Sequence, residues 1–388
     1  MKLDDDPATG SFLLSPSATE VAARLGLWTA AETFDFARIF SRGEPRHKYY
    51  CGRRQWRALS LFAPSLELAP EYSDLLRDAP YPFSVRADAP LSRHDLCRVM
   101  RDTYEGTRFE LARQLLAAGP FGLTDRYDGE PSPCRPPPAA QPSAQPPSAP
   151  LADAADAAIG EAADASHAEA SRSSALQGAF ERPIGIYRMA YSYVGEPQPI
   201  ATDDDATVAI DVSTPSTTPV PTRPSCFHFA PHCSQTAVYF PIACTMATVP
   251  APLAAGSVRA IDREAAYWAF RIAKHTVRGL PWDRCLALMR SRQAAWEAKA
   301  DRLLDAYSLA ADGDDAAARE AASEAALHAF ARDVVADWWA LLDELLLRYG
   351  DGWEHEWEET TGKSKCAPLA YPAEWLEKGG FFARLLTS

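Results

Sequence analysis

The segment that begins at Ser92 constrains the local fold of this chain more than any other stretch. Ser92 can cap a helix, and Asp95, three residues later, can close a capping box. We expect this helix to end at Gly106, because glycine readily adopts the left-handed backbone conformation that ends helices. A second short helix is expected to end at Gly119-Pro120, since proline cannot continue a helix. The sequence therefore predicts a helix–turn–helix element here.

Composition excludes some classes of protein. The chain has 388 residues, of which 47% are hydrophobic, so it can bury a substantial core in one or two domains. Its net charge is -13, and it contains no Lys/Arg run interleaved with aromatic residues, which argues against nucleic acid as a partner. No apolar run approaches the roughly 18 residues that a membrane span needs, so no membrane partner is predicted.

The eight cysteines are scattered and form no Cys-x-x-Cys pair. This pattern favours a reducing, cytoplasmic compartment over a disulfide framework. The stretch Cys226-Phe-His228, followed by His232-Cys233, has the residue types of a metal site but not a common zinc spacing. Adjacent side chains also point apart on an extended chain. We therefore predict no metal and no cofactor.

The chain divides into three parts by composition. Residues 131–176 are rich in Pro, Ala and Ser and have few large apolar side chains, so we predict a disordered insertion. Residues 1–130 and 177–388 then form parts of one folded domain.

Local patterns predict an α+β fold. A helix is expected from Ala30 to about Phe40, and two strands within 183–194 and 235–243. Three helices are expected near the C-terminus, at about 262–278, 281–309 and 314–349. The last is long enough that we expect a kink. His355, between two glutamates, is read as part of a solvated face.

Eight segments, in the same order, resemble the cysteine dipeptidase family of the N-terminal-nucleophile (Ntn) hydrolases. The segments are 34–37, 50–57 with 63–65, 82–85, 101–107, 182–188 with 191–193, 236–241, 267–270 and 337–339. The resemblance implies an αββα sandwich and hydrolysis of dipeptides. It also implies that the thiol of an amino-terminal cysteine is the nucleophile and the free α-amino group its base.

This chain resembles the C-terminal part of such an enzyme. The family's nucleophile lies upstream of the matching segments, whereas the first cysteine here is Cys51, in a context unlike a processing site. The catalytic residues are therefore unknown, and the nucleophile is expected to be absent. The chain is either truncated or a degenerate relative. The alternatives are a non-catalytic pseudoenzyme or helical subunit that binds a partner, and a helical scaffold with disordered linkers and no enzyme ancestry. The sequence leaves open whether it forms a homo-oligomer.

Two arginines are candidates for binding substrate. Arg188 lies in the middle of a predicted hydrophobic strand, where an unpaired arginine is rare. In related Ntn hydrolases an arginine on such a strand reaches the active site, so Arg188 is expected to hold a substrate carboxylate. Arg182, at the start of the same run, is a second candidate. Arg101, Asp102 and Glu105 are instead expected to form a structural ion-pair network.

Overall fold

The computed structural model describes residues 15, 17–32, 34, 39–40, 52–70, 81–82, 85–114, 118–125, 182–197, 223–308, 316–358 and 361–382. The insertion predicted at 131–176 lies outside the described residues. The chain divides into two compact units, Met1–Pro90 with Arg126–Arg182 and Leu91–Asp125 with Pro183–Ser388. The three-part division by composition stays a prediction.

The elements named in the described part of the first unit are short helices and a 3-10 turn. They are α1 (Ala18–Arg24), α3 (Arg53–Phe62) and η4 (Pro64–Leu66). The helix predicted to begin at Ala30 is wrong at its start, because residues 29–32 form a turn. The Glu32 amide donates to the Thr29 carbonyl at 3.0 Å, and the Trp28 indole donates to the Glu32 carbonyl at 2.9 Å. These bonds close the turn.

In the second unit, α4 (Arg93–Met100) begins with the predicted capping box. The Asp95 amide donates to the Ser92 hydroxyl, and the Ser92 amide donates to the Asp95 carboxylate. The helix ends at Met100 rather than continuing to Gly106. Side-chain carboxylates accept the next backbone amides: Tyr104 donates to Asp102 at 2.9 Å. In the described part of the predicted second helix, residues 111–113 form the 3-10 turn η6 (Leu111–Arg113), and Ala118, directly before Gly119, is helical.

An antiparallel sheet has the order β1-β2-β3. Its strands are β1 (Tyr191–Glu196), β2 (Cys226–Pro231) and β3 (Phe240–Ala243). The two predicted strands are therefore correct only at their C-terminal ends, and β2 was not predicted. Residues before β1 bond elsewhere: the Gly185 amide donates to the Asp102 carbonyl at 3.0 Å. A Cβ at Gly185 would lie 2.9 Å from the Arg101 backbone, so this contact excludes a side chain.

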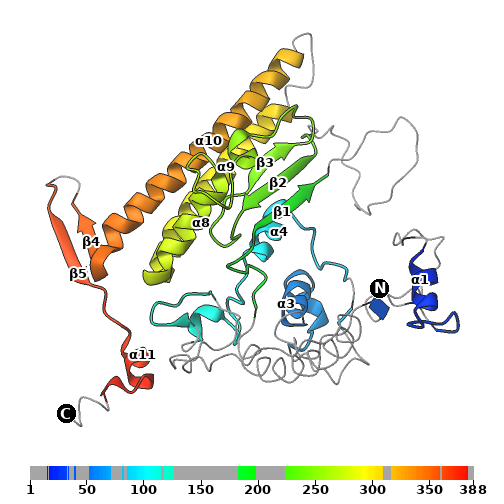
Figure 1. Ribbon diagram of the computed structural model, residues 1–388, viewed down its shortest axis with the longest axis horizontal. Helices are drawn as coiled ribbons and strands as arrows, with labels where there is room; N and C mark the ends of the chain where they lie inside the picture. The colour runs from blue at the N-terminus through cyan, green and yellow to red at the C-terminus, as the bar shows by residue number, and fades with distance from the viewer. Residues whose placement is uncertain are drawn as a thin grey trace, which may run out of the picture. The chain divides into compact units, whose positions relative to one another are not determined.

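Three long helices lie alongside one another beside this sheet (Figure 1). They are α8 (Ala266–Thr276), α9 (Trp282–Ser308) and α10 (Ala316–Tyr349), with α7 (Ala251–Ala254) before them and η7 (Val277–Gly279) between α8 and α9. The predicted positions of α9 and α10 are confirmed within about two residues. The kink expected in α10 is not seen, since the helix runs without interruption. The predicted start of α8 at Asp262 is wrong, because the Asp262 carboxylate instead accepts the Glu264 amide in a local turn.

The core of the second unit joins the sheet to the helices. The Phe240 ring of β3 lies 5.9 Å from the Phe270 ring of α8 and 6.1 Å from the Phe330 ring of α10. The Trp296 ring of α9 lies 5.5 Å from the same Phe330 ring, and Trp338 is fully buried beside Phe270. The helices are thus held to the sheet by apolar burial.

The end of the chain contains a hairpin that the sequence patterns missed. It consists of β4 (Trp353–Trp357) and β5 (Ser364–Pro368), preceded by η8 (Gly350–Gly352) and followed by α11 (Ala373–Lys378). His355 lies in β4 and is half-buried.

The fold is mixed helix and sheet, which agrees with the predicted α+β class. The αββα sandwich stays a prediction. Within the described ranges, no helix combines the length and the apolar character needed to cross a membrane.

Candidate functional site

The two predicted substrate arginines lie before β1 and outside any strand. Arg188 lies in a turn and its side chain is exposed, whereas the sequence placed it in the middle of a buried strand. Arg182 is half-buried. The strand prediction was wrong here because the backbone of this run bonds to the end of α4. The roles of Arg188 and Arg182 in binding substrate stay predictions.

Arg101 forms a buried ion pair with Glu297 of α9. The side chains are only 16% and 9% exposed, and the Nη1 atom donates to the Glu297 carboxylate at 3.2 Å. The Arg101 Nε atom donates to the Ser234 carbonyl at 3.1 Å, and Nη2 to the Ala237 carbonyl at 3.0 Å. The sequence analysis expected Arg101, Asp102 and Glu105 to form an ion-pair network. Arg101 instead pairs with Glu297, on a distant element that the sequence could not indicate, and Glu105 pairs with Arg290.

The segment between β2 and β3, residues 232–239, is entirely buried although it has no regular secondary structure. Side chains from elsewhere satisfy its polar groups. Gln293 of α9 donates to the Gln235 carbonyl at 3.2 Å and to the Ala237 carbonyl at 2.8 Å, and Thr124 donates to the Gln235 side chain at 2.8 Å. A buried loop requires such partners, because unpaired backbone groups are costly away from water.

Four of the described cysteines are buried. Burial raises the pKa of the Cys97, Cys226 and Cys285 thiols to about 12, and it also raises the pKa of Cys233. These thiols are protonated at neutral pH. Because the thiolate is the nucleophile, none of the four is prepared for attack on a carbonyl.

His228 of β2 is fully buried between a carboxylate and a guanidinium. Its Nε2 atom lies 2.8 Å from the Glu196 carboxylate, and its Nδ1 atom lies 3.1 Å from Nη1 of Arg93. Burial, with the nearby Arg93 charge, lowers the pKa of His228 to about 4. Arg93 also pairs with Asp301 of α9. This network links β1, β2, α4 and α9. In the part of the chain that the structure describes, no group of three or more His, Cys, Asp or Glu is placed to hold a metal.

A second cluster of charge lies along α8. Lys274 and Asp125 are fully buried and their charged atoms are 2.7 Å apart, while Arg278 Nε lies 2.9 Å from the same carboxylate. The Lys274 ammonium also lies 3.7 Å from the centre of the Trp282 ring. These contacts compensate the buried lysine charge, as burial of a charge requires.

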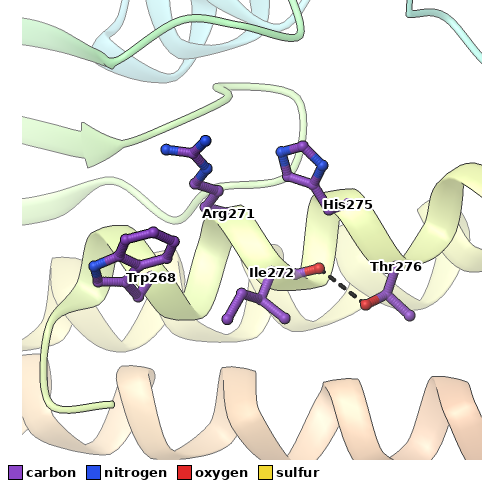
Figure 2. A pocket seen from close by; sticks show the side chains of 5 residues that line it. All are labelled: Trp268, Arg271, Ile272, His275 and Thr276. Carbon is purple, nitrogen blue, oxygen red and sulfur yellow. Dashed lines mark hydrogen bonds between the residues drawn. The ribbon is translucent and has the colours of Figure 1, made fainter. Parts of the chain in front are cut away.

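The outward face of α8 lines a pocket of about 400 Å³. Its residues are Trp268, Arg271, Ile272, His275 and Thr276, which recur at the spacing of one helical face. Figure 2 shows the Arg271 and His275 side chains rising from the same side of the helix, with Trp268 near the beginning of the helix. The Thr276 hydroxyl points elsewhere and donates to the Ile272 carbonyl at 3.0 Å. The pocket therefore combines an aromatic ring, a guanidinium and an imidazole.

His232 lies behind this pocket, at the start of the buried loop. It is 6% exposed, and its ring centre lies 5.7 Å from the Tyr267 ring and 6.2 Å from the His275 ring. Its Nδ1 atom is buried without a hydrogen-bond partner among the described residues. Burial, with His275 and Arg271 nearby, lowers the pKa of His232 to about 3. The imidazole is neutral at pH 7. The sequence analysis did not predict this pocket, because its residues recur at the same spacing as those on any other face of a helix.

Comparison with known families adds one finding. Residues 2–119 match the model of Peptidase family C69. The resemblance to the cysteine dipeptidases is confirmed by this match over the N-terminal part of the chain. The resembling segments from residue 182 onward lie beyond the matched range. A search of curated proteins gave no match.

Proposed function

We propose that this chain is a dipeptidase-family protein that binds dipeptides. We propose further that hydrolysis in the family uses an amino-terminal cysteine nucleophile that this chain lacks. The match of residues 2–119 to Peptidase family C69 is the observation that carries the proposal. The raised pKa of the buried Cys97, Cys226 and Cys285 thiols makes these three poor nucleophiles, since a protonated thiol attacks a carbonyl slowly. Arg188 and Arg182 are proposed to contact the substrate carboxylate.

The purified chain should not hydrolyse dipeptides. The test is a panel of dipeptides incubated with the chain, with and without a thiol-alkylating agent, with release of free amino acids as the readout. We expect no release above the rate without protein. Hydrolysis that is abolished by alkylation would contradict the proposal, and the Arg188→Gln variant would then show whether this arginine affects KM.

A second candidate function is that of a non-catalytic subunit that binds a partner. The observation that favours it is the outer face of the sheet, where Tyr191, Tyr193 and Phe227 are 56%, 54% and 36% exposed. Neighbouring aromatic side chains left open to water are typical of interaction surfaces. Absence of dipeptide binding by calorimetry, together with absence of turnover, would favour this candidate.

A further inference from the structure

Arg271 carries a positive charge that no carboxylate of the described residues compensates. Its contacts with described residues are to neutral groups: Nη1 donates to the Tyr267 hydroxyl at 2.6 Å, and the guanidinium lies 5.5 Å and 5.2 Å from the ring centres of Tyr267 and Trp268. Lys274 and Arg278 on the same helix, by contrast, both pair with Asp125. The pocket thus presents a guanidinium whose contacts among the described residues are to neutral groups.

His275 presents a hydrogen-bond donor beside that guanidinium. Its Nδ1 atom lies 3.0 Å from Nη1 of Arg278. Arginine can only donate, so Nδ1 accepts, and the neutral ring must carry its proton on Nε2. Burial, followed by the Arg278 and Arg271 charges, lowers the pKa of His275, which keeps this ring neutral at pH 7.

The rest of the pocket wall is aromatic and apolar. Trp268 and Ile272 line it next to Arg271. A guanidinium and a neutral N–H together fit the two oxygens of a carboxylate, while the Trp268 ring and the Ile272 side chain fit an apolar group attached near it. An inorganic anion would contact the guanidinium and the N–H group but would leave the Trp268 and Ile272 side chains without a contact.

We propose that the pocket on α8, as an alternative site to Arg188 and Arg182, binds the terminal carboxylate of a short peptide whose last side chain is apolar. Arg271 pairs with the carboxylate, His275 Nε2 donates to it, and Trp268 with Ile272 contacts the side chain. The choice of a peptide rests on the proposed function, whereas the recognition of a carboxylate beside an apolar group does not require that the chain hydrolyse anything.

Isothermal titration calorimetry of the full chain at pH 7 tests this proposal. The ligands are the dipeptide Ala-Phe, its C-terminal amide, free phenylalanine and inorganic phosphate. We expect Ala-Phe to bind at least about tenfold more tightly than the amide, because loss of a charge-assisted contact costs that much. Equal binding of the amide, tighter binding of free phenylalanine or phosphate, or no binding of Ala-Phe would overturn the proposal.

The matched variants are Arg271→Gln and Arg302→Gln, the latter at an exposed arginine of α9. Arg271→Gln should weaken Ala-Phe binding about tenfold while leaving the weak binding of the amide unchanged, and Arg302→Gln should change neither. Arg271→Lys, which keeps the charge but loses the planar fork, should be intermediate. Thermal melts show whether each variant is folded. Unchanged affinity in folded Arg271→Gln would overturn the proposal.

The dipeptide hydrolysis assay is run separately on the same proteins. Binding that depends on the carboxylate and on Arg271, without turnover, supports the pocket even if hydrolysis is absent. Turnover whose KM is the same in Arg271→Gln would overturn the pocket while leaving a dipeptidase activity in place.

Discussion

A single side chain, Arg101, holds together three elements that are far apart in the sequence. It lies at the end of α4, pairs with Glu297 of α9, and donates to carbonyls of the buried loop at Ser234 and Ala237. Its guanidinium also lies 4.9 Å from the centre of the Tyr239 ring. Arginine suits this position because its fixed fork of donors can satisfy several acceptors at once.

Replacing Arg101 should therefore destabilise the second unit strongly. We expect Arg101→Met to lower the free energy of unfolding by about 3–5 kcal/mol, because it leaves the buried Glu297 carboxylate without its partner. Urea denaturation followed by circular dichroism measures this change. The control is Arg98→Met on the same helix, whose side chain is 76% exposed and pairs with Asp95; it should lose no more than about 1 kcal/mol. Equal losses in the two variants would contradict the prediction.

His232 should make stability depend on pH. Its pKa is about 3 in the folded protein against an ordinary value of 6.5, so the unfolded chain binds more protons between these values. Stability from this group is then complete above pH 6.5 and is lost as the pH falls, by about 1.4 kcal/mol per pH unit. The groups facing it include Arg271, Lys274, His275 and Asp125.

The variant that isolates this effect is His232→Asn. His232 has a φ of 60°, and asparagine tolerates this left-handed backbone without titrating. Melting temperatures between pH 4 and pH 7 should fall less steeply in the variant than in the original chain. His228 contributes to the slope in both proteins, so the difference between them reports His232 alone. Identical slopes would show that His232 does not titrate as described.

At the scale of elements, the sheet has two unlike faces. Along β1 the exposed residues alternate with buried ones, because successive side chains point to opposite faces. Tyr191 stacks on Phe229 with ring centres 5.7 Å apart, and Tyr193 on Phe227 at 4.7 Å. Val194 and Ala230 are buried in the core on the other face. The exposed face is thus a row of stacked aromatic rings that contact water.

This aromatic face should bind a hydrophobic dye. We expect the native chain to raise the fluorescence of 8-anilinonaphthalene-1-sulfonate, and the double variant Tyr191→Thr with Tyr193→Thr to reduce this signal by more than half. Threonine keeps the β propensity of the strand while removing the rings. The control is Tyr371→Thr, at a tyrosine 53% exposed outside the sheet. A native chain without dye fluorescence would contradict the prediction.

At the scale of the whole second unit, stability depends on one continuous core. Phe330 of α10 is central to it, because its ring contacts both Phe240 of β3 and Trp296 of α9. We expect Phe330→Ala to lower the free energy of unfolding by about 3–5 kcal/mol, the usual loss for an aromatic removed from a core. Leu347→Ala, at a 65% exposed position of the same helix, should cost about 0.5 kcal/mol or less. Chemical denaturation distinguishes the two outcomes.

Sequence alone determined the features that depend on neighbouring residues. The capping box at Ser92, the start of α9 after Pro281 and the extent of α10 up to Gly350 were all predicted, because caps and apolar periodicity act within a few residues. The family resemblance was also readable in short motifs of the N-terminal part, which the match of residues 2–119 confirms.

Tertiary structure decided what depends on distant partners. The run before β1 looked like a strand, yet its backbone bonds to Asp102, so Arg188 lies in a turn. The loop at 232–239 is buried only because Arg101 and Gln293 satisfy its carbonyls. The pocket on α8 contains an arginine without a carboxylate partner among the described residues, because Lys274 and Arg278, rather than Arg271, pair with Asp125. Such pairings join residues more than fifty positions apart, and no local pattern encodes them.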